Sequence, residues 1–323
     1  MVEQKRFDVV CVGTAAWDVL LTGIDRNVMN LDGQYAKGYF ASSGGAAVNA
    51  AISMSRLGIN TAVCVLVGED SPAGLVLHDL ELAGVNTDYV ITRKDVHTAS
   101  PVILVDESGD RHILRVPDNG NQFLCREMIS DEMMIKSRHL HLASANVLSR
   151  LDGAPLGDLF QRAKELGLTT SMDASHDKDG RWIHNIEAAL NHCDIFFPSL
   201  QEASEFAKST DIDEIFRFFS AYPIRIFGIK MGEKGAMVTD FKNTWERPTL
   251  FKEKPTDTTG AGDAFLAAFV AAWLKGYALP SCLDIGSAHV CSVLRRPGAN
   301  RSAGTWEDME QVLWLNGISL EKL

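Results

Sequence analysis

The sequence Asp257-Thr258-Thr259-Gly260-Ala261-Gly262-Asp263 leads directly into the apolar run Ala264-Phe265-Leu266-Ala267-Ala268-Phe269. A loop of small residues followed by such a run predicts a buried helix over 261–275 that begins within the loop. The backbone N–H groups of residues 260–262 would then lack partners and could bind an anion. The carboxylate of Asp263 lies beside them. This stretch therefore combines an anion site with a base, as phosphoryl transfer to a hydroxyl group requires.

Other phosphate-binding motifs do not fit the chain. No Gly-x-x-x-x-Gly-Lys-Ser/Thr sequence is present, which excludes a P-loop enzyme. Phe265 stands where a dinucleotide-binding fingerprint has its third glycine, and the loop does not follow the first strand. A dehydrogenase is therefore a weak alternative. A helix cap without function is the other alternative reading of Asp263.

Composition limits the class of protein. A chain of 323 residues, 46% hydrophobic and 23% charged, is typical of one large globular α/β domain. The net charge of −11 argues against nucleic acid or an anionic membrane as partner. The longest apolar run, 264–274, is shorter than the roughly 20 residues that span a bilayer. Six scattered cysteines without a Cys-x-x-Cys pair indicate reduced thiols in a cytoplasmic protein.

Short apolar runs alternate with helical patterns. This predicts an α/β fold of three layers, with a mostly parallel central sheet between two layers of helices. The expected strands are 9–12, 61–67, 101–106, 112–116, 139–143, 168–172, 195–197 and 224–229. The expected helices are 46–57, 73–83, 155–166, 186–192, 202–207, 261–275 and 283–294. We expect a single domain over 1–323, with about 20–40 and 99–117 pairing as a small β lid or, alternatively, decorating a sheet edge.

Polar residues near the N-terminus suit a polyol ligand. Asp18 follows the first strand at the carboxyl end, where α/β sheets bind ligands. Gly44 and Gly45 open a helix and allow close backbone approach to a ligand. Asn49, one turn later, offers both a donor and an acceptor. We expect these four residues to contact the hydroxyl groups of a sugar.

Several motifs occur in a fixed order along nearly the whole chain. They are Gly44-Gly45 through Asn49 with Arg56-Leu57-Gly58, then Val67-Gly68-Glu69-Asp70 with Gly74, then Lys230-Met231-Gly232-Glu233-Lys234-Gly235, and last the 257–263 heptad. With these motifs the chain resembles the ribokinase-like, or PfkB, family of carbohydrate kinases. Leu142-Ala143-Ser144 and Leu151-Asp152-Gly153 further resemble its YdjH-like branch of bacterial sugar kinases.

The resemblance implies an ATP-dependent kinase that uses Mg²⁺ and phosphorylates a hydroxymethyl group of a sugar or sugar acid. It implies Asp263 as base, Gly260, Ala261 and Gly262 as anion hole, and Asp18, Gly44, Gly45 and Asn49 as the sugar site. It assigns Lys230, Gly232 and Gly235 to the nucleotide, and Glu202 to Mg²⁺ through water. A K⁺ site is implied at Asp257, Thr259, Val293, Arg296, Gly298 and Ser302. A homodimer paired through the lid is also implied.

The chain departs from the family pattern at informative positions. The common Asn-x-x-Glu motif is replaced by Ser199-Leu200-Gln201-Glu202. Ser199 therefore stands where the family has an asparagine amide close to the ligands of Mg²⁺. Ala46 and Ser144 replace residues expected of a ribokinase, which argues against D-ribose. A nucleoside kinase, with Trp17 as its aromatic clamp, and a catalytically silent sugar-binding regulatory protein are the competing functions.

Overall fold

The structure is a computed structural model that describes residues 5–108 and 110–322. Within these residues, eight strands form one sheet in the order β14-β13-β12-β11-β10-β9-β1-β4. The bounds are β1 (Phe7–Val12), β4 (Thr61–Cys64), β9 (Ser137–Ala145), β10 (Thr169–Ala174), β11 (Ile195–Phe196), β12 (Ile226–Lys230), β13 (Ala236–Thr239) and β14 (Thr244–Arg247). Neighbours from β4 to β12 are parallel, while β13 and β14 pair antiparallel. The predicted mostly parallel sheet is confirmed.

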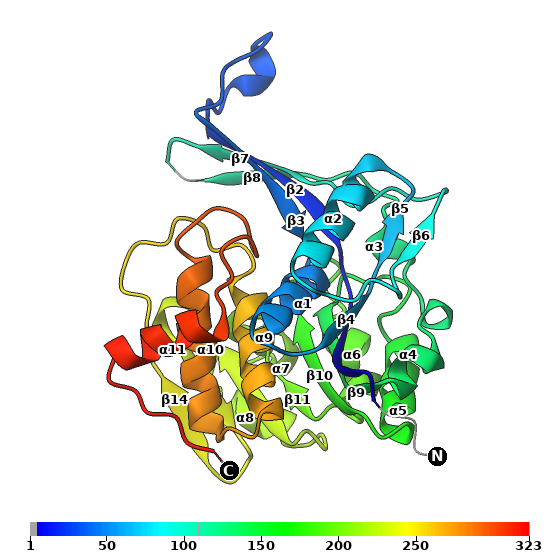
Figure 1. Cartoon of the computed structure of the whole chain (residues 1–323), viewed down its shortest axis with the longest axis vertical. Coiled ribbons are helices and arrows are strands. Elements are labelled where there is room, and N and C mark those ends of the chain that lie inside the picture. The colour runs from blue at the N-terminus through cyan, green and yellow to red at the C-terminus, as the bar shows by residue number, and fades with distance from the viewer. Residues whose placement is uncertain (1–4, 109, 323) are drawn as a thin grey trace.

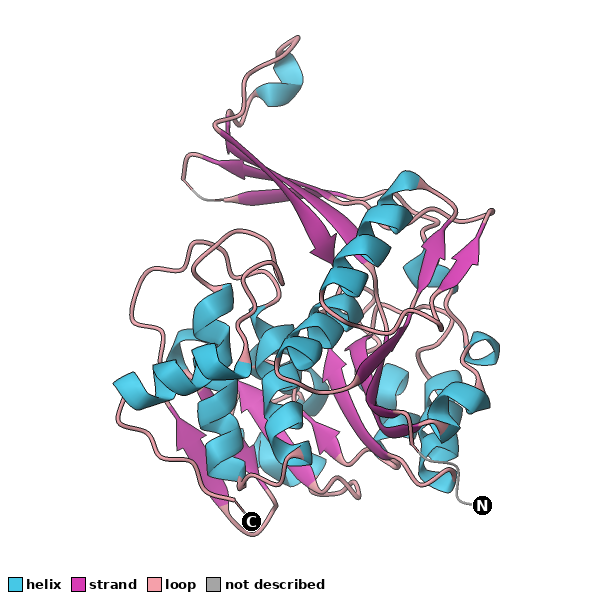
Figure 2. Cartoon of the chain, in the orientation of Figure 1, coloured by secondary structure: helices cyan, strands magenta, loops and turns pink. Residues whose placement is uncertain are grey.

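Helices cover both faces of this sheet (Figure 2). Their bounds are α1 (Ala46–Arg56), α2 (Ser71–Leu82), α3 (Gly120–Phe123), α4 (Asp131–Ile135), α5 (Ala154–Glu165), α6 (Ile183–Leu190), α7 (Leu200–Ala207), α8 (Ile212–Phe219), α9 (Ala261–Leu274), α10 (Leu279–Val293) and α11 (Trp306–Leu315). Side chains of β1 alternate between two apolar clusters. Val9 and Cys11 pack with α1, α2, α9, α10 and α11, whereas Val10 and Val12 pack with α4 to α8. The three-layer prediction is thereby confirmed.

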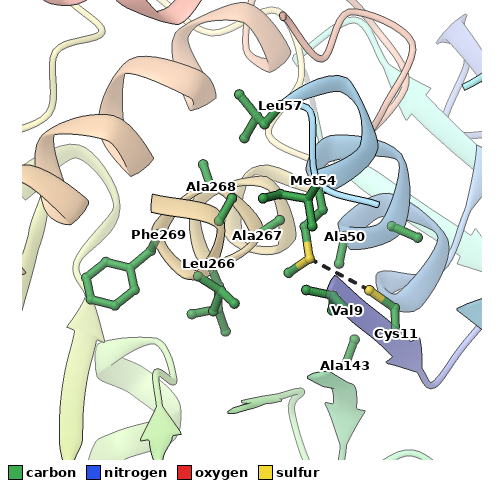
Figure 3. Packing of buried hydrophobic residues seen from close by; sticks show 14 of the residues in the cluster. Val9, Cys11, Ala50, Met54, Leu57, Ala143, Leu266, Ala267, Ala268 and Phe269 are labelled. Carbon is green, nitrogen blue, oxygen red and sulfur yellow. Dashed lines mark hydrogen bonds between the residues drawn. The ribbon is translucent and has the colours of Figure 1, made fainter. Parts of the chain in front are cut away.

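Helix α9 is enclosed by the core. All its residues from Ala264 to Ala272 are buried, as its apolar sequence predicts. Figure 3 shows α9 beside α1, with Ala267 and Ala268 close to Met54 of α1. Small alanine side chains allow this close approach, and close-packed interiors leave a helix little freedom to shift. The N-terminus of α9, which carries Asp263, is therefore held firmly.

A second, small sheet projects from the main body (Figure 1). It has the order β3-β2-β7-β8, with bounds β2 (Ala16–Ile24), β3 (Gly38–Gly44), β7 (Val102–Asp106) and β8 (Arg111–Leu114). The β2–β3 connection, with the short helix η1 (Val28–Asn30), forms the tip. The expected segments 20–40 and 99–117 overlap this sheet. Strands β2 and β3 reach beyond the first expected segment, from residue 16 to residue 44. Its action as a lid stays a prediction.

Some expected elements differ in the structure. The prediction of one strand over 61–67 is wrong, because β4 ends at Cys64 and β5 (Leu66–Gly68) pairs with β6 (Ile91–Arg93) in a separate sheet. The carbonyl of Val65 accepts from Ile91 N, which draws the chain away from β1. Strands β6, β13 and β14 and helices α3, α4, α8 and α11 were not predicted, and strands β2 and β3 were expected only as parts of the segment 20–40 that pairs with 99–117. Across 5–108 and 110–322, no helix combines the length and apolarity needed to cross a membrane.

Candidate active site

The segment 257–263, called the anion loop below, ends at the N-terminus of α9. Gly260 adopts a left-handed conformation with φ of 73°, and a Cβ there would lie 2.4 Å from the Cβ of Ala299. Only glycine fits this position without strain. Within the described chain, the N–H groups of Gly262 and Asp263 donate to no acceptor, whereas Ala261 N donates to Thr258 O at 3.3 Å. The expectation of a free amide is therefore wrong for Ala261.

Asp263 is held in place through one carboxylate oxygen. Asn49 Nδ2 donates to Asp263 Oδ2 at 2.8 Å, and Asn300 Nδ2 donates to Asn49 Oδ1 at 2.9 Å. Asn300 also donates to the carbonyl of Ser43 at 3.0 Å, which fixes the amide network to the end of β3. Asp263 Oδ1 accepts no hydrogen bond from any described residue, and the residue is half-buried. That oxygen is free to accept from a ligand hydroxyl group.

A buried ionic cluster lies beside the anion loop. Lys230 Nζ, at the end of β12, contacts both oxygens of Asp173, at the end of β10, at 2.6 and 2.5 Å. A Cβ on Gly262 would lie 3.3 Å from the same Nζ, so the ammonium group lies next to the loop. The parallel strands bring these side chains to one edge of the sheet. The cluster places a cation where an anion bound at the loop would need one.

Glu202 forms part of a capping box at the start of α7. Its Oε2 accepts from Ser199 N at 2.8 Å, and Ser199 Oγ accepts from Glu202 N at 3.3 Å. The helix cap therefore uses one oxygen of Glu202. The negative charge of Glu202 raises the pKa of both Lys230 and Asp263. Within the described residues, no group of three or more His, Cys, Asp or Glu side chains forms a metal cluster.

The pKa values follow from burial and from the ionic cluster. Burial raises the pKa of Asp263 to about 6, and Asp173 adds to the rise, while the bond from Asn49 and the charge of Lys230 oppose it. Burial alone would lower the pKa of Lys230, but the carboxylates of Asp173 and Glu202 outweigh it and raise that pKa. Lys230 therefore stays charged, and Asp263 is ionised at neutral pH.

We expect the ionisation of Asp263 to appear in the pH dependence of kcat/KM. The value of kcat/KM should fall as pH drops below about 6, because a protonated carboxyl cannot accept the hydroxyl proton.

The folded chain also binds this proton more tightly than the unfolded chain. The wild type should therefore lose stability relative to Asp263→Asn as pH rises from about 4 through about 6. If the fall of kcat/KM at low pH persists in Asp18→Asn, the fall is assigned to Asp263. If the fall is lost in that variant, the assignment is contradicted.

Asp18 lies on β2 directly against the end of β3. A Cβ on Gly44 would lie 2.0 Å from Asp18 Oδ2, so glycine is required there. Burial and the nearby charge of Asp257 raise the pKa of Asp18 to about 6, opposed by Arg115. Gly45 has φ of 86° and starts α1, which brings Asn49 to the same region. Asn49 thus contacts Asp263, and Asp18 lies against Gly44, next to the start of α1; their role as a sugar site stays a prediction.

Trp17 does not share this region. Successive side chains of a strand point to opposite faces, so Trp17 points away from the face of Asp18. It is half-buried and packs against the core cluster that contains α1 and α9. An aromatic clamp at Trp17, as expected for a nucleoside kinase, is therefore not supported.

Asp257 joins the anion loop to the segment after α10. Its Oδ1 accepts from Thr259 N at 3.0 Å and Thr259 Oγ1 at 2.7 Å, and its Oδ2 accepts from Gly298 N at 3.2 Å. Thr256 N donates to Leu294 O at 2.9 Å, so the two segments run side by side. The hydroxyl of Ser302 is buried without a hydrogen-bond partner among the described residues.

The glycines after Lys230 shape a turn. Gly232 lies in the short helix η3 (Gly232–Lys234), and no atom lies within 4 Å of a Cβ built on it. Gly235 has φ of 99°, and a Cβ there would lie 2.0 Å from the carbonyl of Arg247. Met231 N donates to Gly235 O at 2.8 Å and closes the turn. Open space beside Gly232 leaves room for a ligand.

Sequence reasoning missed three residues of the site. Asp173 carries a signal, since it follows a strand at the carboxyl end of the sheet. Arg111 of β8 contacts Asp257 at 3.6 Å and donates to Thr258 Oγ1 at 3.0 Å, a contact made only by the folded small sheet. Asn300 lies in an irregular loop 251 residues from its partner Asn49, and no local pattern marks it.

Known proteins resemble this chain in sequence and in fold. An ATP-dependent ribose-1-phosphate kinase from Halopiger xanaduensis is 31% identical over 298 residues, covering 92% of this chain and 95% of that protein. The ribokinase of Arabidopsis thaliana, solved with ribose and ATP, superposes with a TM-score of 0.81 at 22% identity and covers 95% of this chain and 98% of its own. An E. coli protein assigned as ribokinase II, solved with ATP and Mg²⁺, gives 0.82 at 19% identity, covering 96% and 99%.

The family model described as "pfkB family carbohydrate kinase" matches residues 6–306. This match spans the main sheet, the small sheet and the anion loop. The chain therefore belongs to the pfkB family of carbohydrate kinases.

Proposed function

We propose that the protein transfers the γ-phosphoryl group of ATP to a hydroxymethyl group of a sugar or sugar acid, with Asp263 as the base. One observation carries this proposal: Asp263 Oδ2 is held by Asn49, while Oδ1 is free beside the unpaired N–H groups of Gly262 and Asp263. A carboxylate so placed can orient a hydroxyl group toward a phosphoryl group held by the amides.

The neighbouring residues have separate roles in this reaction. The N–H groups at the start of α9 hold the oxygens of the migrating phosphoryl group, and the helix dipole favours its negative charge. Lys230 compensates developing charge on the nucleotide side, and Gly232 leaves space for the phosphates. Asp18, with Gly44 and Gly45, positions the sugar by accepting from its hydroxyl groups. The proton of the reacting hydroxyl passes to Asp263 late in the step.

Glu202 and Asp173 are the residues that fit Mg²⁺. Both are carboxylates beside Lys230, and Mg²⁺ prefers oxygen ligands and keeps several waters. The capping bond of Glu202 to Ser199 uses one of its oxygens, so a contact through water suits it better than direct coordination. When bound, Mg²⁺ neutralises charge on the nucleotide phosphates.

The segments 257–259 and 293–302 fit a K⁺ ion. Asp257 supplies a carboxylate and accepts from Thr259 and Gly298, while Val293, at the end of α10, and Arg296 belong to the segment that follows. The buried hydroxyl of Ser302 has no partner among the described residues, which is costly unless a ligand satisfies it. A cation there would stabilise the turn on which the anion loop rests.

We expect K⁺ to activate the enzyme. Replacing Na⁺ or choline with K⁺ should raise kcat severalfold, because an ordered anion loop holds the phosphoryl group better. Asp257→Asn should lose most of this response. Equal rates in K⁺ and choline buffers for the wild type would contradict a K⁺ site.

The supporting relatives leave the sugar open. The Halopiger relative is named for a phosphorylated pentose, and the Arabidopsis structure holds ribose. A coupled assay of ADP release over sugars, sugar phosphates, sugar acids and nucleosides tests the proposal. Release only with a sugar or its derivative supports it. A response only to nucleosides would favour a nucleoside kinase, and no response would favour a silent binding protein.

We also propose that two copies pair through the small sheet. Opposite the face of Asp18, this sheet carries exposed apolar residues, with Tyr39 at 66% and Leu114 at 47% exposure. Burying such surface stabilises association. Sedimentation of the purified protein tests this.

All six cysteines are free, which supports a reducing cytoplasmic location.

A further inference from the structure

The face of the small sheet that carries Asp18 also carries an arginine at the end of β8. Strand pairing joins Val19 to Val102 and Val102 to Leu114. The next row of this register runs from Asp18 across β7 to Arg115, the residue that follows β8. Paired residues of neighbouring strands point to the same face, so the side chain of Arg115 lies on the face of Asp18.

Arg115 and Asp18 lie near each other without direct contact. Two strand spacings of about 4.8 Å separate the ends of their row, a gap that an arginine side chain spans in large part. Burial and the charge of Asp257 raise the pKa of Asp18, and the charge of Arg115 opposes this rise. Among residues 5–108 and 110–322, no hydrogen bond or ion pair joins the two side chains. One ligand can therefore contact both through different atoms.

The guanidinium group of Arg115 is available to a ligand. The side chain is exposed and makes no hydrogen bond or ion pair within the part of the chain that the structure describes. The other arginine on this face, Arg111, is already engaged, since it donates to Thr258 Oγ1 at 3.0 Å and lies 3.6 Å from Asp257. An exposed arginine without a partner is common, so the position of Arg115 decides its role.

This face of the small sheet is turned toward the anion loop. Arg111 reaches the anion loop from this face. Ser42, the partner of Asp18 on β3, lies beside the loop after α10, because a Cβ on Gly298 would lie 3.0 Å from Ser42 Oγ. The anion loop ends at Asp263. A ligand between the sheet and the anion loop would present one end to Asp263 and the other to β8.

The electrostatics of this region favour a role for a cation. Three carboxylates, those of Asp18, Asp257 and Asp263, border the region between the sheet and the anion loop, and the whole chain carries a net charge of −11. These charges repel an anionic ligand unless a cation compensates them locally. A neutral sugar needs no such compensation. The charge of Arg115 therefore favours an anionic ligand over a neutral one.

We propose that the sugar substrate carries an anionic group, a carboxylate or a phosphate, at the end remote from the reacting hydroxymethyl group, and that Arg115 binds this group. The planar guanidinium donates two parallel hydrogen bonds to the oxygens of such a group, a geometry that a sugar hydroxyl does not match. Asp18 accepts from the hydroxyl groups between the two ends. The inference rests on the proposed function and narrows it to sugar acids and sugar phosphates.

Steady-state kinetics of ADP release test the substrate class. Ribose with ribose 1-phosphate, fructose with fructose 6-phosphate, and glucose with gluconate form matched pairs, and every member keeps a free hydroxymethyl group. We expect kcat/KM to be higher by about tenfold or more for the anionic member of at least one pair, since one charge-assisted contact is gained. A preference within a phosphate pair identifies a phosphate as the bound group, and a preference for gluconate identifies a carboxylate.

Variants test the role of Arg115. Arg115→Gln should raise KM for the preferred anionic substrate by about tenfold or more with kcat nearly unchanged, because the contact is made equally in the ground state and the transition state. The KM for the neutral member should not change. Arg115→Lys should show a smaller loss, because it keeps the charge but not the planar fork. Arg217→Gln, which removes an exposed arginine from α8, should behave like the wild type.

Three kinetic results overturn the inference. The first is that the neutral member is used as well as its anionic counterpart, or better, in every pair. The second is that Arg115→Gln keeps the wild-type preference for the anionic member. The third is that Arg115→Gln loses activity equally with both members of a pair, which would give Arg115 a role other than recognition of an anion.

Failure of the proposed function would give a different result. If none of the compounds releases ADP, the proposed function fails, and calorimetric titration of the same pairs decides the inference. Tighter binding of an anionic member that is lost in Arg115→Gln supports the inference. Equal binding by wild type and Arg115→Gln, or no binding, overturns it, because this variant leaves any phosphate held at the anion loop unaffected.

Discussion

Asp263→Asn is expected to lower kcat by about 10²–10⁴-fold with little change in the affinity for the sugar. The asparagine oxygen can still accept the bond from Asn49 Nδ2, which lies 2.8 Å from Asp263 Oδ2, so the local geometry survives. The variant loses only the negative charge and the ability to take a proton. The loss should therefore appear in kcat, because that interaction is made in the transition state.

The measurement is ADP release at saturating sugar and ATP, with sugar binding measured separately by calorimetry. Asp213→Asn, an exposed carboxylate in the first turn of α8, is the matched control and should keep the wild-type rate. A near-normal kcat in Asp263→Asn would remove Asp263 from the role of base. Loss of sugar affinity with unchanged kcat would instead make it a binding residue.

Lys230→Met is expected to have the second large effect, on both stability and rate. Lys230 and Asp173 are 14% and 5% exposed, and the substitution leaves the carboxylate of Asp173 without its counter-ion. Breaking a buried ion pair in this way costs about 3–5 kcal/mol. Loss of the cation beside the anion loop should also lower kcat by about 10²–10³-fold, as for removal of one preorganised electrostatic contact.

A double variant separates the two effects of Lys230. Lys230→Met with Asp173→Leu removes both charges, so chemical unfolding should show much of the lost stability restored. The rate should stay low, because the cation is still absent and the variant also lacks Asp173, one of the two residues proposed for Mg²⁺. Lys94→Met is the control, since Lys94 is 83% exposed and pairs with Glu69 at 3.6 Å, a contact worth about 0–1 kcal/mol. Recovery of kcat in the double variant would contradict a role for Lys230 in the reaction.

The sequence predicted the main sheet better than the small one. Strands such as β1 and β4 are buried on both faces, and the stretches Val9–Val12 and Ala62–Cys64 read as apolar runs. In contrast, β8 is exposed along its length, and β2 is half-buried, so neither gives a clear period. Helix α11 was missed although Thr305 and Asp308 form a capping box at its start, a signal that the sequence does contain.

The site was predictable where a local motif exists. The anion loop, Asp263 and Lys230 lie in glycine-rich stretches that are recognisable along the chain. Asn300 and Arg111 act through contacts between segments that lie far apart in sequence, and only the packed structure brings them to Asn49 and Thr258. The same applies to the pKa of Asp263, which depends on burial and on Asp173.

The position of the acceptor hydroxyl relative to Asp263 tests the central claim most directly. A crystal structure with the sugar found by the ADP-release screen and a non-hydrolysable ATP analogue gives that distance. We predict about 2.6–3.2 Å between Asp263 Oδ1 and the reacting hydroxyl, with the γ-phosphoryl oxygens at the N–H groups of the first turn of α9. A complex in which the hydroxyl lies beyond the reach of one bridging water from Asp263 would contradict the account.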